Sequence, residues 1–504
     1  MIPLRYRLRG RVRLTDASGA PHAVCDLPLA VLRLDSRSAR LLEATAGGAA
    51  VDELAADLGM DPERVVRMCE YFRSRGLLDV ELDRHAGTTP SVTIVVPVKD
   101  RAADLDDCLA SLASLDYPRD LLEVIVVDDG SSDASAAVAA QRSCTVLVNE
   151  RNQGQSYSRN LAASCAAGDI LAFADSDCVV DPGWLRELVV PFVWPRVSAV
   201  GGRVESFFAT TLLDRYEQSA SSLDMGRRLV VSLDAVDSFY MPTCNLLVRR
   251  DAYIAVGGLR EDLRVGEDVD LCWRLRARGD VMVYAPRGRV QHKHRDRWPA
   301  MLRRRAEYGA SEATLYTLHT DKRKRLLLPA WPTLSLAIVL AVLLLRNLRL
   351  VPFALLPWTI DVAWRLLNLR GEGVTVSPWL VGFSALRVHL SLAHSLLFLA
   401  VRYCLLGLVV VSAFVPRLRL PVAFAALYTS AVDYSVKRPR MTYPTYAGCY
   451  VLEHSAYQVG VALGCLRRRT LRPYRISLAA RPGGRVRLGQ LPLGASSPPR
   501  SRAT

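Results

Sequence analysis

The sequence predicts an α/β chain in which a sheet of parallel strands follows a small winged-helix-like domain and precedes membrane-spanning helices. Short β-branched runs alternate with helical stretches between residues 92 and 174, which is the pattern of a parallel sheet. Residues 1–88 carry a hairpin pattern and several helical patterns of their own. From residue 321 onward, the chain holds apolar runs long enough to cross a bilayer as helices.

The composition agrees with several domains and an anionic partner. A chain of 504 residues suits two to four domains. Its formal net charge of +15 favours nucleic acid, a nucleotide or a membrane surface as the partner. The 11 cysteines are scattered without a Cys-x-x-Cys pair, which argues against a disulfide framework and a zinc ribbon and indicates a reducing compartment.

The first residues predict a strand rather than a signal peptide. Residues 1–14 alternate arginine with apolar residues and contain no continuous apolar segment. The alternation over residues 9–14, followed by the turn-forming Ala17-Ser18-Gly19, predicts a hairpin.

Helical patterns and a closing strand follow this hairpin. Residues 36–46 and 51–58 have helical spacing. Asp61 as N-cap and Pro62 at the first helical position predict a further helix that ends near residue 75, before a strand over residues 77–82. Helices followed by a strand suggest a winged-helix or helix-turn-helix shape. Both a recognition module for peptide or DNA and a structural appendage agree with this pattern.

A short linker over residues 85–90 leads into the alternation of strands and helices. The first strand is a continuous β-branched run, and the fourth is a small apolar run that predicts a buried strand. The predicted strands are residues 92–98, 123–127, 145–148 and 170–174, and the predicted helices are residues 101–115, 131–140 and 154–167.

Chemically informative side chains stand at the ends of these strands. Pro97-Val98-Lys99-Asp100 ends the first strand, Asp128-Asp129 the second and Asp175-Ser176-Asp177 the fourth. Doubly wound α/β sheets bind their ligands at the carboxyl ends of the strands. Two carboxylates spaced i, i+2 there can hold Mg²⁺ or Mn²⁺, which in turn can clamp a diphosphate. A solvated acidic turn is the alternative for an isolated Asp-x-Asp.

Two later stretches add ionisable groups. Gly266-Glu267-Asp268 opens a helical pattern, so both acidic residues would lie in the first turn, near the positive end of the helix. His292-Lys293-His294 follows a strand predicted over residues 281–284, and a neutral imidazole can complete a divalent-metal site. A surface basic cluster is the alternative for these histidines.

The ordered set of motifs resembles the family 2 glycosyltransferases, which are inverting sugar-nucleotide enzymes with the GT-A (Rossmann-like) fold. The resemblance covers about residues 91–310. It implies a UDP-sugar donor whose uridine is bound by the first two strand ends, and it leaves open which of Asp128 and Asp129 contacts the uracil. The implied nucleotide-binding residues are Pro97, Val98, Asp100, Asp128, Asp129, Arg159 and Asp175.

The same resemblance implies a metal site and a catalytic base. Asp268 matches the base, and Glu267 beside it is a second catalytic candidate. Inversion at an anomeric carbon needs one base to take the proton from the incoming hydroxyl, and a raised pKa at Asp268 would help this step. No second carboxylate is needed as a nucleophile, in contrast to a retaining hydrolase. The implied ligands of Mg²⁺ or Mn²⁺ are Asp175, Asp177 and one of His292 and His294, with Asp177 the direct ligand of the Asp-x-Asp pair.

Two segments bear on the acceptor. Met241-Pro242-Thr243-Cys244-Asn245, followed by Arg249-Arg250, lies where the family forms its acceptor wall. His294 stands where processive synthases carry the glutamine of Gln-x-x-Arg-Trp, and Arg297-Trp298 completes that motif. This departure argues against a translocating channel and favours a few sugars added one at a time.

The last part of the chain predicts an integral membrane region with two to four crossings. A basic cluster at residues 322–325 precedes the uncharged residues 326–345 and indicates a cytoplasmic flank, and thus a cytoplasmic catalytic domain. A buried helical domain is the alternative. Weaker apolar runs follow at residues 348–367, 395–415 and 420–432.

The predicted domains are residues 1–88, 89–320, 321–435 and 436–504. The last is expected to hold an interfacial helix and a disordered basic tail, because ten arginines and no acidic residue follow residue 465.

The domain order narrows the implied function. Residues 1–88 resemble the small peptide-chaperone domain of the pyrroloquinoline quinone pathway. Joined to a family 2 domain and a membrane tail, they resemble the glycosyltransferases of the mycofactocin system. This resemblance implies transfer of glucose from UDP-glucose, in β-1,4 linkage, onto a peptide-derived redox cofactor or its precursor. The implied partners are the UDP-sugar, that acceptor and membrane lipid, and no nucleic acid is expected.

Two other functions stay open. One is a family 2 enzyme of polysaccharide or glycolipid assembly, in which the membrane helices hold a lipid acceptor. The other is a membrane-tethered regulator whose helix-turn-helix binds DNA. The intact Asp175, Asp177 and Asp268 argue against the regulator, since a pure binding module has no need of them.

Overall fold

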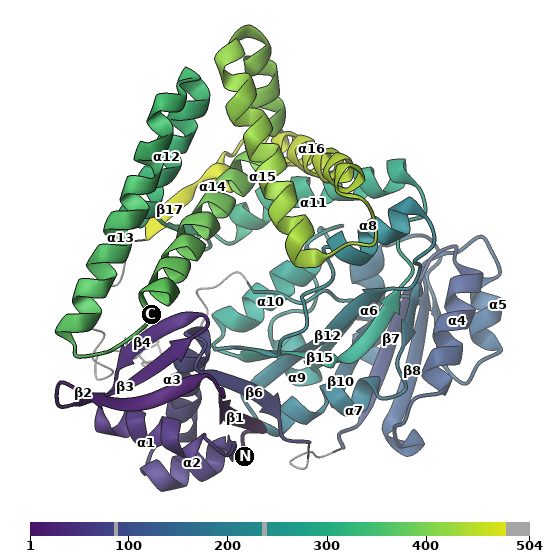
Figure 1. Ribbon diagram of the computed structural model, residues 1–504. Coiled ribbons are helices and arrows are strands. Elements are labelled where there is room, and N and C mark those ends of the chain that lie inside the picture. The colour runs from purple at the N-terminus through teal and green to yellow at the C-terminus, as the bar shows by residue number, and fades with distance from the viewer. Residues whose placement is uncertain (85–88, 234–238, 480–504) are drawn as a thin grey trace, which may run out of the picture.

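The computed structural model describes residues 1–84, 89–233 and 239–479. Figure 1 shows an N-terminal region in purple, a central sheet with flanking helices in blue and teal, and C-terminal helices in green to yellow. Most of the predicted linker and the basic tail beyond residue 479 lie outside the described residues.

The N-terminal region combines two small antiparallel sheets with three helices. Its hairpin is confirmed, because Ala17 pairs with Ala20 across the predicted turn. The single strand predicted over residues 1–14 is wrong: the chain turns where the Val12 amide donates to the Arg9 carbonyl, and the two halves join different sheets. The sheets are β5-β1-β6 and β2-β3-β4, formed by β1 (Leu4–Leu8), β2 (Val12–Ala17), β3 (Ala20–Asp26), β4 (Leu29–Arg33), β5 (Ala49–Ala50) and β6 (Leu78–Leu82).

The helices of this region begin and end where the sequence signals stand. They are α1 (Ser36–Ala44), α2 (Val51–Leu58) and α3 (Pro62–Ser74). The Asp61 side chain accepts from the Arg64 amide at 3.1 Å, so the predicted N-cap is confirmed. An ion pair of Arg84 with Glu187 at 2.6 Å and another of Glu63 with Arg196 join the region to the central sheet.

Four parallel strands form one half of the central sheet, in the order β10-β7-β8-β9. All four strands are confirmed close to their predicted bounds. The helix predicted from residue 131 begins only at Ser135, because Asp128 accepts from the Ser131 amide and Asp133 accepts from the Ser135 amide, which holds the intervening residues as a loop. The elements are β7 (Val92–Val98), α4 (Ala102–Ala113), β8 (Leu122–Asp128), α5 (Ser135–Ala140), β9 (Thr145–Val148), α6 (Gln155–Cys165) and β10 (Ile170–Ala174).

The parallel pairing predicted for residues 92–174 is confirmed, whereas the other half of the sheet is mixed. Strand β14 (Asn245–Arg249) runs antiparallel between β10 and β12 (Val197–Ser206). The strand predicted over residues 281–284 continues as β15 (Val281–His292), because it resumes pairing with β12 after a register shift. The remaining strands are β11 (Cys178–Val180) and β13 (Val230–Ser232), and the helices are α7 (Trp184–Leu188), α8 (Leu212–Ala220), α9 (Arg250–Ala255), α10 (Glu267–Ala277) and α11 (Trp298–Leu318).

Five α-helices follow within the described residues 321–479, and two segments there are long and apolar enough to cross a membrane, Leu348–Gly371 and Pro378–Phe414. The span predicted over residues 326–345 is shorter than expected. Its first leucines belong to β16 (Lys324–Leu327), which pairs with β17 (Ile476–Ala479), and the helix begins only after Pro329. The helices are α12 (Ala330–Leu345), α13 (Val351–Gly371), α14 (Pro378–Phe414), α15 (Arg419–Lys437) and α16 (Tyr443–Arg468).

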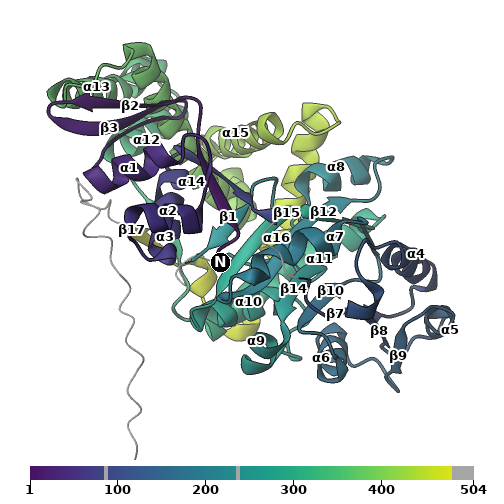
Figure 2. The same cartoon turned by 90° about the horizontal axis from the view of Figure 1, so that it is seen from below.

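Helix α16 lies beside α11, as Figures 1 and 2 both show. Small residues allow the close approach: a β-carbon at Gly460 would lie 1.9 Å from the Ala306 carbonyl oxygen, and one at Gly464 would lie 2.4 Å from that of Ala310. Arg305 of α11 also pairs with Glu453 of α16 at 3.0 Å. Helix α16 is thereby fixed to the helix that follows the central sheet.

Candidate active site

One cavity of about 1520 Å³ runs from the carboxyl ends of β7, β8 and β10 to the C-terminal helices. Pockets for one drug-sized ligand commonly have about 300–1000 Å³. The space is therefore large enough to hold two substrates at once. Its position at the strand ends is the one expected of a doubly wound sheet.

The two aspartates after β8 have different surroundings. Both are buried, but only Asp129 lines the cavity. Its carboxylate accepts from the Asn149 side chain at 2.8 Å and from the amides of Gln153 at 2.7 Å and Gly154 at 2.8 Å. Asp128 instead accepts from the Ser131 amide at 2.9 Å. The structure thus favours Asp129 over Asp128 for a contact with a ligand in the cavity.

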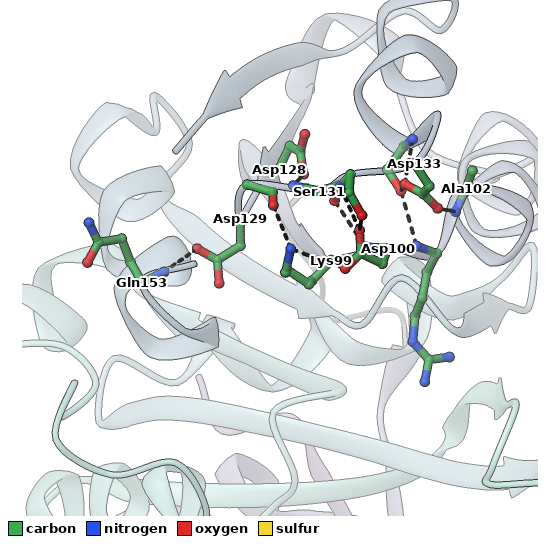
Figure 3. A network of polar contacts seen from close by, with 12 residues as sticks. Lys99, Asp100, Ala102, Asp128, Asp129, Ser131, Asp133 and Gln153 are labelled. Atoms are coloured by element: carbon green, nitrogen blue, oxygen red, sulfur yellow. Dashed lines mark hydrogen bonds and ion pairs between the residues drawn. The ribbon is translucent and has the colours of Figure 1, made fainter. Parts of the chain in front are cut away.

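Asp100 makes polar contacts with the loop after β8, as Figure 3 shows. It does not line the cavity. Its carboxylate accepts from the Ser132 amide at 2.6 Å and from the Ser132 hydroxyl at 2.9 Å, and it lies 3.1 Å from the Lys99 ammonium. These contacts lower the pKa of Asp100 to about 2, and the hydrogen bond from the Ser132 amide has the largest effect. From the same strand end, Pro97, Val98 and Lys99 do line the cavity.

Arg159 lies behind the cavity wall. Its side chain is fully buried, with one nitrogen 2.5 Å from the Asp175 carboxylate and another 3.6 Å from Glu267. Gln155 also donates to Glu267, at 2.7 Å. Asp175 and Glu267 face the cavity. Arg159 therefore acts on the cavity through these two carboxylates.

The register of the sheet brings one of the two histidines to the Asp-x-Asp motif. Cys178 pairs with His292 between β11 and β15, so His292 lies beside Asp177, with Nε2 3.4 Å from Oδ1. That oxygen is buried and has no hydrogen-bond partner among the described residues. His294 instead lies 3.0 Å from the Ser206 hydroxyl and 3.4 Å from Asp214.

These contacts separate the predicted metal ligands. Ligand atoms of Asp177, Cys178 and His292 lie within 4.8 Å of one another. A hydrogen bond with Cys244, together with burial, raises the pKa of the Cys178 thiol, so this group stays protonated. A carboxylate and an imidazole suit Mg²⁺ or Mn²⁺ better than a neutral thiol does. Asp177 and His292 therefore fit a divalent cation, whereas His294 is committed to other partners.

The predicted base is held at the start of α10. Gly266 has φ +84°, a conformation that favours glycine, and it turns the chain so that the helix begins at Glu267. Asp268 lines the cavity and accepts from the Val269 amide at 2.7 Å. Burial raises the pKa of Asp268, partly offset by the positive charges of Arg159 and Arg304. A carboxylate of raised basicity facing a cavity can accept a proton from a bound hydroxyl.

Burial likewise raises the pKa of Glu267, and the charge of neighbouring Asp268 adds to this effect. Both predicted catalytic carboxylates thus have raised pKa values. Asp268 is the less buried of the two, and Glu267 is engaged with Gln155. We therefore regard Asp268 as the better placed base.

Several lining residues were missed from the sequence. Arg101 lies 3.2 Å from Asp177. Arg304 and Tyr240 line the cavity near Asp268, and no motif marks them. The C-terminal helices contribute a second set, for which the single Arg402 within an apolar run was the only signal.

Residues 93–257 match the model of the family described as "Glycosyl transferase family 2". This segment of the chain is similar to the family 2 glycosyltransferases. The resemblance stated from the motifs is thereby confirmed. Asp175 and Asp177 lie inside the matched segment, and Asp268 and His292 follow it.

Curated proteins that match this chain include two glycosyltransferases. The pre-mycofactocin glycosyltransferase of Mycobacterium tuberculosis is 36% identical over 254 residues, which is 49% of this chain and 53% of the relative. Glycosyltransferase AglE of Haloferax volcanii is 34% identical over 197 residues, which is 38% of this chain and 62% of the relative. The chain spans about half the length of the mycobacterial relatives it matches.

Solved structures are more distant. The mannosyltransferase PcManGT from Pyrobaculum calidifontis, solved in complex with GDP-Man and Mn²⁺, is 18% identical, with a TM-score of 0.38 over 60% of this chain and 88% of that chain. GalNAc-T7 with UDP, GalNAc and Mn²⁺ is 16% identical, with a TM-score of 0.34 over 45% of this chain and 48% of that chain.

The residues of the predicted acceptor segment have two different roles in the structure. Pro242, Thr243 and Cys244 line the cavity. Asn245 is fully buried, accepts from the Trp184 indole at 2.7 Å and donates to the Arg203 carbonyl at 2.9 Å. The first three residues are therefore available to a ligand, and Asn245 stabilises the sheet.

Proposed function

We propose that this protein is an inverting glycosyltransferase that transfers glucose from UDP-glucose, in β-1,4 linkage, to the peptide-derived redox cofactor mycofactocin or its precursor. The observation that carries the proposal is the 36% identity to the pre-mycofactocin glycosyltransferase over a segment of 254 residues. The convergence of Asp129, Asp175, Asp177 and Asp268 on one cavity supports it.

The donor is held by the strand ends. Asp129, Pro97 and Lys99 face the region where the nucleoside would lie. Asp177 and His292 would hold Mg²⁺ or Mn²⁺, which when bound neutralises negative charge on the leaving diphosphate. Arg159 keeps Asp175 and Glu267 in place through its buried charge.

Transfer is a single displacement. The acceptor oxygen forms a bond to the anomeric carbon, and the bond from that carbon to the β-phosphate oxygen breaks, with its electron pair leaving on UDP. Asp268 takes the proton of the acceptor hydroxyl. Because one displacement occurs, the anomeric configuration inverts, and no carboxylate is needed as a nucleophile.

The C-terminal helices attach the enzyme to the cell membrane in this proposal. The segments Leu348–Gly371 and Pro378–Phe414 have the length and composition to cross a bilayer. The basic residues 322–325 precede them and favour a cytoplasmic catalytic domain. In this proposal, residues 1–88 recognise the peptide part of the acceptor.

The test is a mass measurement. The full chain in detergent is incubated with UDP-glucose, Mn²⁺ and a mycofactocin precursor, beside Asp268→Asn. Hexose additions by the wild type that are absent with the variant are the expected result. Release of UDP without addition of hexose to any precursor would support glycosyltransferase activity but contradict the assignment of mycofactocin as the acceptor.

A membrane glycosyltransferase of polysaccharide or glycolipid assembly is the second candidate. The two long apolar segments favour it, since they could hold a lipid acceptor. The succinoglycan biosynthesis protein ExoU of Rhizobium meliloti, 29% identical over 206 residues, is a relative with such a role in its name. Transfer to a polyprenyl phosphate in the same assay would support this candidate.

A further inference from the structure

The inner end of the cavity is formed by helices rather than by the sheet. We call it the inner chamber and define it by Phe398 of α14 and by Tyr446, Tyr450 and His454 of α16, all of which line the same cavity as Asp268. The residues proposed to bind the sugar-nucleotide donor lie at the strand ends and do not include these four. Because the cavity is continuous, a molecule in the inner chamber can present a hydroxyl toward Asp268.

Aromatic rings surround the chamber at several angles. The Tyr450 and His454 rings are 4.2 Å apart and inclined at 69°, and the Phe398 and His454 rings are 5.4 Å apart and perpendicular. The ring centroids of Tyr446 and Tyr450 are 6.1 Å apart. Such rings offer flat faces against which the C–H groups of another ring can pack.

Three buried polar atoms in the chamber lack a partner. The Tyr446 and Tyr450 hydroxyls and the His454 Nδ1 have no hydrogen-bond partner among the described residues, although these residues are only 0%, 1% and 4% exposed. Buried polar groups without partners are rare in native proteins because they cost free energy. A ligand that supplies hydroxyl groups could satisfy these atoms. Burial lowers the pKa of His454 to about 4, so its ring is neutral near pH 7 and can accept a hydrogen bond.

The carboxylates near the chamber are already paired. Glu453 accepts from Tyr216 at 2.6 Å and pairs with Arg305 at 3.0 Å. Asp433 lies 3.2 Å from His394 and 2.9 Å from Lys437. The Arg402 guanidinium lies over the Phe398 ring at 5.8 Å and over the Tyr457 ring at 3.6 Å. The paired carboxylates do not select a cationic ligand, and the polar lining does not suit a hydrocarbon chain. A ring that carries hydroxyl groups fits both conditions, and its oxygens can also accept from a guanidinium.

We propose that the inner chamber is an acceptor subsite that binds a sugar ring, which packs on Tyr450 and forms hydrogen bonds with Tyr446 and His454. This inference rests on the proposed function and deepens it. An acceptor that already carries one sugar would place that sugar in the chamber and its free hydroxyl near Asp268. The enzyme would then extend a short glycan one sugar at a time.

The test uses the full chain in detergent with methyl β-glucoside as the acceptor probe. Tyr446→Phe keeps the ring and removes the hydroxyl, and His454→Phe keeps a ring and removes both nitrogens. Tyr428→Phe is the matched control, because it removes a tyrosine hydroxyl from α15 that donates to the Leu390 carbonyl outside the cavity. Glucoside binding is measured by saturation-transfer NMR, and its KM is measured from UDP released with UDP-glucose and Mn²⁺.

The expected result is a rise of about two- to tenfold in the Kd and KM for the glucoside with Tyr446→Phe, the usual effect of losing one neutral hydrogen bond. The KM for UDP-glucose should change far less, and Tyr428→Phe should match the wild type. Equal glucoside affinity in the wild type, Tyr446→Phe and His454→Phe would overturn the inference, as would no glucoside binding by the wild type. Failure of the wild type to release UDP from any UDP-sugar would instead overturn the proposed function. The NMR measurement needs no turnover, so it tests glucoside binding separately from that function.

Discussion

The carboxylates on the two sides of the cavity are the same chemical group in opposite surroundings. At the end of β8, Asp129 accepts three hydrogen bonds, and nearby Asp100 has its pKa lowered by the Ser132 contacts. At the start of α10, burial raises the pKa of Glu267 and Asp268. On the first side hydrogen bonds fix the loops around a ligand, and on the second side burial leaves a base able to take a proton.

The largest expected effect comes from removing the base. Asp268→Asn keeps the shape of the side chain but cannot accept the proton, so we expect transfer to fall by about 10²–10⁴-fold. The rate of sugar transfer at saturating donor measures this. Asp262→Asn is the matched control, because Asp262 is exposed and does not line the cavity. A similar loss in both variants would contradict the assignment.

The next effect separates the two histidines. We expect His292→Gln to raise the Mn²⁺ concentration for half-maximal activity by at least about tenfold, since it removes a ligand of the cation. His294→Gln should raise it much less, because His294 contacts Ser206 and Asp214 instead. Titration of Mn²⁺ into EDTA-treated protein measures both. Equal effects would contradict the distinction made here.

On the opposite side of the cavity, the expected effect is on stability. Asp129→Ala removes the acceptor of the buried Asn149 side-chain amide and of the partly buried Gln153 and Gly154 amides, which costs about 2 kcal/mol of unfolding free energy. Asp100→Ala should cost less, since the Asp100 side chain is exposed and water can replace its contacts. Thermal unfolding of both variants measures the difference. A larger loss for Asp100→Ala would reverse our interpretation of these loops.

The smallest expected effect is a shift in pH dependence. Asp268 must be ionised to act, so activity falls as the pH drops through its pKa, and this acidic limb should lie above the value of about 4 for an ordinary aspartate. Arg304→Gln removes a positive charge that lowers this pKa, so the limb should move to higher pH, by less than about one unit. Arg303→Gln, at an exposed neighbouring position, is the control. A shift to lower pH would contradict the assignment of this limb to Asp268.

Local patterns predicted the local structure well. The strand Ile170–Ala174 was found at its predicted bounds, because a small apolar run stands between Gly168-Asp169 and the aspartates. Helix α3 likewise begins where Asp61 and Pro62 mark it. Most of the residues at strand ends also met around one cavity, since parallel strands share an edge, but Asp100 and Asp128 did not.

Long-range pairing was not predictable in the same way. Strand β14 inserts antiparallel between two other strands, and β15 continues past a register shift, neither of which has a local signal. The choice of His292 over His294 depends on that register. Arg159 was expected at the nucleotide, but its burial depends on packing that only the whole fold determines. The inner chamber joins residues far apart in the chain, so no motif could reveal it.

The glycine contacts between α11 and α16 determine where the chain can be cut. A soluble fragment ending near residue 320 would keep every motif of the catalytic domain, yet it would expose the face of α11 on which Gly460 and Gly464 rest. It would also leave the buried Arg305 without Glu453. Expression of the protein for crystallisation or screening therefore calls for a fragment that retains α16 together with α14, which contributes Phe398 to the same cavity.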